Sequence, residues 1–149
     1  MANHVRRQIR ERVATLVTGL TTTGARVFES RTYALSTSTE LPCLLVYSLR
    51  EDISEDASSF CRQERAITIS IEAVAKATAN LDDTLDLICK EVEVALATDK
   101  TLSGLAKRVR LASSELQLQG GDTPQRVGAA RMTWNVRTST EEGVPDVVV

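Results

Sequence analysis

A regular strand pattern followed at once by a regular helix pattern constrains this fold more than any other feature of the sequence. Over residues 67–72 isoleucine alternates with Thr, Ser or Glu, which is the period of two expected of a half-buried strand. Beyond a hinge at 76–79, apolar residues recur every three or four positions, at Leu81, Leu85, Ile88, Val92 and Leu96. This spacing lines one face of an α-helix. The two apolar faces can cover each other, which predicts an α+β domain.

The length and composition fit one folded domain. A chain of 149 residues can bury about two-thirds of its unfolded surface without help from a metal or a disulfide. Its 42% of hydrophobic and 26% of charged residues are normal for a globular protein and unlike those of a disordered one. We expect one domain over residues 1–140 and a C-terminal tail over 141–149.

Catalytic and metal-binding motifs are missing from the sequence. The three cysteines, Cys43, Cys61 and Cys89, form no CxxC pair, and His4 is the single histidine. This pattern predicts free thiols, buried at Cys43 and Cys89, and argues against a zinc site or a disulfide framework. No phosphate loop or dinucleotide fingerprint occurs. We therefore expect no cofactor, no metal and no enzymatic activity, although a hydrolase that uses only carboxylates stays open.

The charge balance argues against a nucleic-acid binder. The formal net charge is -2, the isoelectric point is near 5.5, and aromatic residues make up only 3%. No apolar run approaches the roughly 20 residues of a membrane span. The first helix has a basic face, but at this length it is more typical of a solvated or subunit-facing surface than of a membrane-binding or nucleic-acid-binding one.

The remaining elements follow the same reasoning. Further apolar patterns predict a helix at 4–18 and strands at 25–31, 43–49, 108–119 and 130–137. The order α-β-β-β-α-β-β predicts a sheet of about five mostly antiparallel strands, with the two main helices packed on one face. The apolar run 43–49 suggests a central strand that is covered on both sides.

Local signals predict several details. Asn3 and Asn80 are expected to cap the two helices, and Asp82 and Asp83 complement the dipole of the second. The alternation of apolar residues slips by one position near Ser113, which predicts a β-bulge that returns Leu116 and Leu118 to the inward side. Residues 101–107 read as a turn or short helix, and 120–124 as a hairpin turn. Trp134 should anchor the core against the second helix.

The segment 50–65 is interpreted as a long acidic loop. It lies between two predicted strands and carries Glu51, Asp52, Glu55 and Asp56. Loops of this length in a compact domain are usually binding elements or disordered. The spacing of a calcium loop is missing, so a flexible hairpin arm that contacts a partner is the favoured interpretation.

Two further features favour a subunit that assembles. Fourteen of the eighteen basic residues are Arg, a residue enriched at protein interfaces, although Arg-rich codon usage in the host explains this equally well. The chain ends in three valines at 147–149. An apolar end of this kind either folds onto its own domain or extends the sheet of a neighbour.

Six segments that cover nearly the whole chain resemble a known family in kind and order. They are the helix at 5–20 and the sequences ARVFESR (25–31), LPCLLVYSLRED (41–52), RAITISIEAVAK (65–76), LDDTLDLICKEVEVAL (81–96) and RMTWNVRTST (131–140). In this arrangement the chain resembles the tail terminator proteins of long-tailed phages, the lambda type of minor tail protein.

The resemblance implies a function in phage assembly. Such subunits form a hexameric ring, cap the finished tail tube, stop its polymerisation and present a docking surface to the head connector. The implied partners are further copies of the chain, the tail tube protein and a head–tail connector or neck protein. DNA would pass through the lumen without sequence-specific contact, and no membrane is involved. The implied location is the head-proximal end of the virion tail, after assembly in the host cytoplasm.

A ring needs two different complementary patches on each subunit. The basic helix face with Arg108 and Arg110 and the acidic segment 51–56 could supply them, a hypothesis that charge reversal at Glu51 and Asp52 tests. The candidate subunit or tube contacts are Arg6, Arg10, Arg50, Glu51, Asp52, Glu55, Asp56, Arg108, Arg110, Val147, Val148 and Val149. The alternatives are a neck or head-completion ring protein and, less favoured, a small-molecule-binding or enzyme domain.

Overall fold

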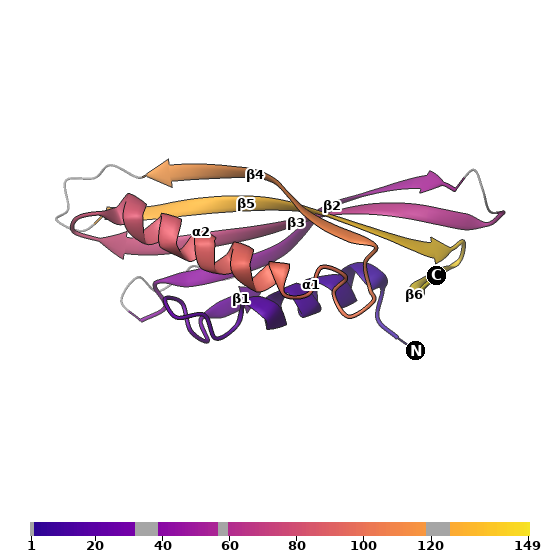
Figure 1. The fold of residues 1–149 in the computed structure, drawn as a ribbon, viewed down its shortest axis with the longest axis horizontal. Helices are drawn as coiled ribbons and strands as arrows, with labels where there is room; N and C mark the ends of the chain where they lie inside the picture. The colour runs from indigo at the N-terminus through magenta and orange to yellow at the C-terminus, as the bar shows by residue number, and fades with distance from the viewer. Residues whose placement is uncertain (1, 32–38, 57–59, 119–125) are drawn as a thin grey trace.

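The computed structural model describes residues 2–31, 39–56, 60–118 and 126–149. Within these residues lie two helices and six strands (Figure 1). In chain order they are α1 (Val5–Val17), β1 (Val27–Glu29), β2 (Cys43–Glu55), β3 (Arg62–Ala77), α2 (Leu81–Ala97), β4 (Arg108–Leu118), β5 (Arg126–Glu141) and β6 (Val144–Val148).

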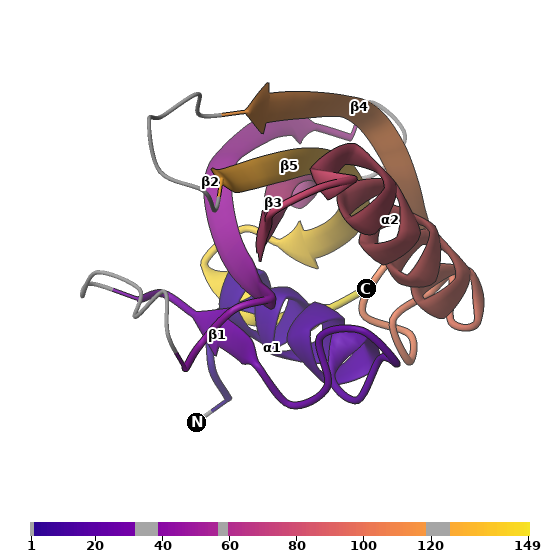
Figure 2. The same ribbon diagram turned by 90° about the vertical axis from the view of Figure 1, so that its left-hand side faces the viewer.

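The strands form one sheet with the order β1-β2-β3-β5-β4, and β6 pairs with the end of β5. Only the β1–β2 pair among the described strands is parallel. Both helices lie on the same side of this sheet, as the end-on view in Figure 2 shows. The predicted α+β fold is therefore confirmed. The sheet has six strands instead of about five because the end of the chain adds β6.

The apolar stripes of both helices are buried as predicted. The five α2 residues Leu81, Leu85, Ile88, Val92 and Leu96 are each at most 9% exposed. The predicted cap at Asn3, however, is wrong, and the predicted cap at Asn80 is confirmed in position only. The His4 side chain, and not Asn3, accepts the amide N–H of Arg6 at the start of α1. Asn80 occupies the cap position of α2 in a left-handed conformation (φ 56°), so its side chain does not bond the helix.

The core fills the space between the helices and the sheet. The three isoleucines of β3 and Trp134 of β5 lie in it, as predicted. The opposite face of the sheet is less exposed to solvent than the alternation of isoleucine with polar residues predicts. A small second cluster centres there on Cys43, Leu45 and Val74, and Ser70 is only 2% exposed. Cys43 is buried as predicted, and burial raises the pKa of its thiol to about 11.

The hairpin expected within 50–65 is confirmed, whereas the interpretation of the segment as a loop is wrong. β2 continues to Glu55 and β3 begins at Arg62, and the two antiparallel strands project together beyond the helices (Figure 1). Residues 62–65 also pair with 138–141 of β5. Their backbone groups are bonded on both sides, although no apolar core lies beneath them to impose an alternating pattern. We call the described residues of this projection, 49–56 and 60–65, the arm.

The predicted β-bulge in β4 is confirmed, since the register with β5 shifts between Leu111 and Ser113. Leu116 and Leu118 nevertheless remain 52% and 51% exposed, because α2 packs mainly on β3 and β5 and leaves the edge strand β4 uncovered. Residues 101–105 form turns and no helix. The predicted hairpin turn at 120–124 lies outside the described residues.

An ion pair fastens α1 to the turn after α2. Arg12 donates two hydrogen bonds to Asp99, at 2.8 and 3.2 Å, and the amide N–H of Ser103 donates a third at 3.1 Å. The bonds from Arg12, followed by that from Ser103, lower the pKa of Asp99 to about 2. The carboxylate is therefore ionised throughout the neutral range and joins two segments that are distant in the sequence.

Truncation of the α2 stripe should destabilise the fold. We expect Ile88→Ala to lower the free energy of unfolding by about 3 kcal/mol, because it leaves a cavity in a fully buried site. Leu87→Ala, one position away on the same helix and 48% exposed in the wild type, is the matched control and should cost less than about 1 kcal/mol. Urea unfolding followed by circular dichroism measures both, and equal losses would contradict the assignment of the buried face.

The Asp99 ion pair predicts a defined acid dependence. Because the pKa of Asp99 is lower in the folded chain than in the unfolded one, its contribution to stability is complete above pH 4 and is lost as the pH falls toward 2. Wild type should therefore be more stable than Asp99→Asn at pH 6, and this difference should shrink between pH 4 and pH 2. Urea unfolding at several pH values measures it. A constant difference would argue against the ion pair.

Candidate interaction surface

A buried ion cluster lies where the arm leaves the body. The Glu51 carboxylate accepts hydrogen bonds from Arg65 at 2.6 Å and from Arg6 at 3.0 Å. The side chains of Arg65 and Glu51 are only 6% and 7% exposed. Arg65 also donates to Thr140 at 2.7 Å and to Gln63 at 3.0 Å. The cluster joins α1, β2, β3 and β5, and it satisfies the buried charge of Arg65.

A second cluster braces the other face of the sheet at the same level. Glu64 accepts hydrogen bonds from the ammonium group of Lys107 and from the hydroxyl of Ser139, both at 2.6 Å. These two bonds lower the pKa of Glu64. Glu64 and Glu51 therefore anchor the base of the arm from opposite faces of the sheet.

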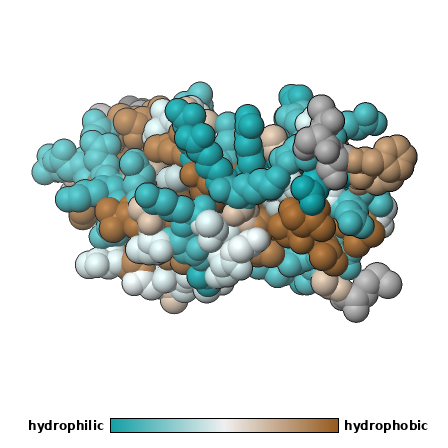
Figure 3. Space-filling model, turned by 45° about the vertical axis from the view of Figure 1, so that its right-hand side comes forward, coloured by the Kyte–Doolittle hydropathy of each residue, from teal (hydrophilic) through white to brown (hydrophobic). Residues whose placement is uncertain are grey.

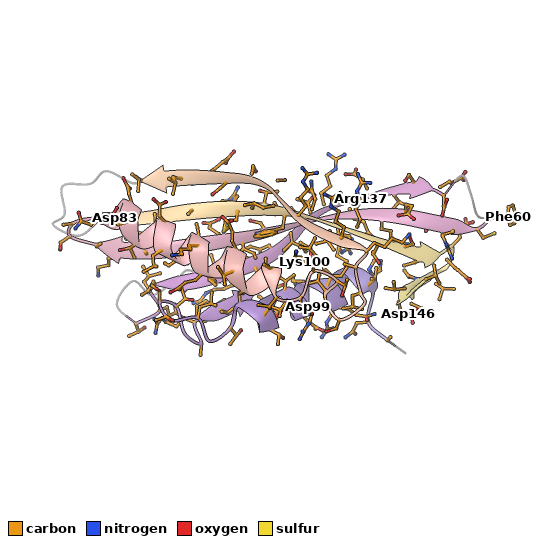
Figure 4. All side chains as sticks on the ribbon, viewed as in Figure 1. Phe60, Asp83, Asp99, Lys100, Arg137 and Asp146 are labelled. Atoms are coloured by element: carbon orange, nitrogen blue, oxygen red, sulfur yellow. The ribbon has the colours of Figure 1, made fainter. Side chains whose placement is uncertain are left out.

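The arm itself exposes apolar side chains. Leu49 and Ile53 are 56% and 52% exposed, and Phe60, at the far end of the molecule, is 96% exposed (Figure 4). Arg50 binds Asp52 beside them at 2.7 to 2.9 Å. Figure 3, which turns the arm end forward, shows apolar patches set among hydrophilic side chains. Apolar groups that protrude in this way are typical of surfaces that contact another protein.

Three arginines gather on the sheet face away from the helices. Arg108 and Arg137 are directly opposite each other on β4 and β5, and Arg110 follows one pleat further along β4. All three are exposed, and within the described part of the chain none forms an ion pair or a side-chain hydrogen bond. We call these three residues the arginine patch. Like charges this close repel each other, so the patch favours an acidic partner.

The end of the chain folds back onto its own sheet. β6 pairs with β5, the Val149 amide donates to the Ser139 carbonyl at 3.0 Å, and Gln8 of α1 donates to the Asp146 carbonyl at 2.9 Å. Val148 packs against the core, whereas Val147 remains 50% exposed. Of the two alternatives for this apolar end, the structure confirms folding onto the same domain.

Residues 4–137 match the family described as phage minor tail protein U. The chain belongs to this family. It is therefore a structural protein of a phage tail and part of the virion.

Other comparisons add little to this assignment. A chain from a solved virion of a native gene transfer agent particle is 15% identical to the tail protein, with 90% of this chain and 92% of that chain covered and a TM-score of 0.36. A likeness at this level carries no argument about function. No curated protein matches the sequence.

The structure places several of the predicted contact residues of this tail protein in bonds within the chain. Arg6 and Glu51, predicted to face a neighbour, bind each other, and Arg10 lies 3.6 Å from Glu29. Glu55 is exposed on the arm, and the Asp56 amide donates to the Arg62 carbonyl. Among the described residues, neither Arg108 nor Arg110 forms an ion pair with an acidic side chain of the same chain.

Sequence reasoning missed three residues of these surfaces. The sequence patterns place Arg65 and Arg137 only at the ends of predicted strand segments and Phe60 only within the segment 50–65. An aromatic residue within a polar hairpin is a signal that could have revealed Phe60. The roles of Arg65 and Arg137 depend on partners from other strands, so no local signal could have revealed them.

The described residues show no sign of other kinds of site. They contain no group of three His, Cys, Asp or Glu side chains placed to hold a metal ion. No helix among them is both long and apolar enough to cross a membrane.

Removal of the charge on Glu51 should destabilise the tail protein. In Glu51→Gln the Arg65 guanidinium stays buried without a counter-charge, which should cost about 3 kcal/mol in the free energy of unfolding. The neighbouring Asp52→Asn is the matched control: its side chain is 56% exposed, so the urea midpoint should barely move. Equal, small effects in both variants would show that the ion cluster does not brace the arm.

Proposed function

We propose that this minor tail protein forms a ring that caps the tail tube, ends its polymerisation and provides the docking surface for the head connector. The proposal joins the family assignment to the resemblance with tail terminators. Its ring is a homo-hexamer at the head-proximal end of the tail, assembled in the host cytoplasm. Its partners are the tail tube protein and a head–tail connector, and DNA passes through the lumen without sequence-specific contact.

The arm is the observation that carries this proposal. It extends the sheet beyond the helices and ends at Phe60, which is almost fully exposed. Exposure of an aromatic ring and two aliphatic side chains on a thin hairpin is unfavourable for an isolated subunit. In a ring, a neighbouring copy or the end of the tube would cover the arm and remove this apolar area from water.

The polarity of the subunit also supports a ring. Head-to-tail contacts that close into a ring require two different patches on each copy. The arm lies at one end of the long axis, whereas Asp83 at the start of α2 lies at the other (Figure 4). We assign Arg50, Asp52, Glu55 and Asp56 of the arm, the exposed valines of the C-terminus, and Arg108 and Arg110 to contacts with neighbours or with the tube. Arg6, Arg10 and Glu51 hold the arm and α1 in place for these contacts.

Loss of the protein should lengthen the tails. A phage with a stop codon early in this reading frame, grown in a host that does not suppress it, should produce tubes of uncontrolled length without attached heads. A host that suppresses the stop codon should restore normal particles. Negative-stain electron microscopy of the lysates measures tube length directly. Tails of normal length beside filled, unattached heads would reject the terminator function and favour a neck or head-completion role.

A further inference from the structure

We propose that the groove between α2 and β4 receives the arginine patch of a neighbouring copy of the same chain. This inference rests on the proposed ring and names the two surfaces that join its subunits. It differs from the pairing expected from the sequence, in which the segment 51–56 supplied the acidic surface.

The groove is open because α2 leaves β4 uncovered. It has a volume of about 500 Å³, and its lining includes Cys89 and Val94 from α2 and Ser114 and Leu116 from β4. Val94 is 61% exposed and Leu116 is 52% exposed. Leu118 lies further along the same strand, also half-exposed. The groove therefore offers apolar area that a second protein surface would remove from water.

Carboxylates without partners surround this apolar floor. Asp86 and Glu93 line the groove from α2 with Lys90 between them. Within the described part of the chain, no ion pair or side-chain hydrogen bond involves Asp86 or Glu93. Asp82 and Asp83 extend the negative charge to the first turn of the helix.

The arginine patch has the opposite charge and the same lack of partners. It lies on the sheet face away from the helices, whereas the groove lies on the helix side, so the two surfaces of one chain cannot meet. Most of the other arginines are already bound within the chain, Arg6 and Arg65 by Glu51, and Arg12 by Asp99. The arginine patch and the groove are therefore two complementary surfaces left over after folding. This is the property that a head-to-tail contact between identical copies requires.

The segment 51–56 is a poorer partner for the arginine patch. The Glu51 carboxylate already binds two guanidinium groups and is nearly buried, and Asp52 is bound by Arg50. Neither carboxylate is free for an incoming arginine. The groove combines free carboxylates with apolar area, and guanidinium groups suit such surfaces because they lose less on desolvation than ammonium groups do.

A charge-swap experiment tests this contact on the full chain. One variant carries Arg108→Glu and Arg110→Glu, and the other carries Asp86→Lys and Glu93→Lys. Each alone should self-associate about 100-fold more weakly than wild type, because like charges then face each other. An equal mixture should recover assemblies in which the two variants alternate, since each altered surface then meets a complementary one. Native mass spectrometry over a range of concentrations measures mass and composition together.

A control variant and the pattern of outcomes distinguish a failure of this contact from a failure of the proposed ring. Arg7→Glu with Lys100→Glu makes the same charge change as the arginine variant outside both surfaces and outside the arm, so it should leave assembly unchanged. Circular dichroism should show all variants folded. If either variant alone forms rings as wild type does, or if the mixture of the two forms no assemblies, the contact is overturned and the proposed function stays intact. Recovery of dimers alone would support the contact and overturn the ring. A wild type that stays monomeric would overturn the contact, and tail length in the stop-codon phage would then decide the function.

Discussion

The backbone ladder between β3 and β5 holds the whole molecule together. Both strands are 16 residues long and pair over their full length, so one continuous ladder serves two different environments. Along one part, the isoleucines of β3 and Trp134 face the helices and form the core. Along the rest, buried polar groups replace apolar ones, and Arg65 binds Thr140 across the two strands. The arm is therefore an extension of the same sheet that carries the core.

Charged side chains near the base of the arm differ from those further away in whether they have partners within the chain. Where the arm joins the body, Glu51 and Glu64 are bound within the chain, and each braces one face of the sheet. Further from this junction, charged groups on the arginine patch and in the groove of α2 and β4 have no partner among the described residues. Folding thus leaves opposite charges on two separate surfaces. Complementary charged surfaces of this kind favour association between protein chains and set their relative orientation.

Sequence patterns predicted what depends on local periodicity. The α2 stripe, the central β3 strand, the bulge near Ser113 and the single-face packing of the helices all follow from the spacing of apolar residues. A hairpin arm was expected at 50–65, but the length of its strands was missed, because residues 62–65 pair with β5 and need no apolar alternation. The Glu51–Arg65 cluster was missed for a similar reason, since it depends on which strands become neighbours. Asn80 occupies the expected cap position but makes no side-chain capping bond, because its backbone adopts a left-handed turn that the sequence alone does not specify.

Hydrogen exchange of the backbone amides tests most directly whether the arm is a continuation of the core sheet. If the ladder is continuous, amides of 62–65 and of 138–141 that bond across it should exchange far more slowly than in an unstructured chain, as the amides of 67–71 in the core should also do. The arm would then be held in place before any partner binds. Exchange of residues 62–65 at the unstructured rate, beside a protected core, would contradict this picture and return the segment to a loop.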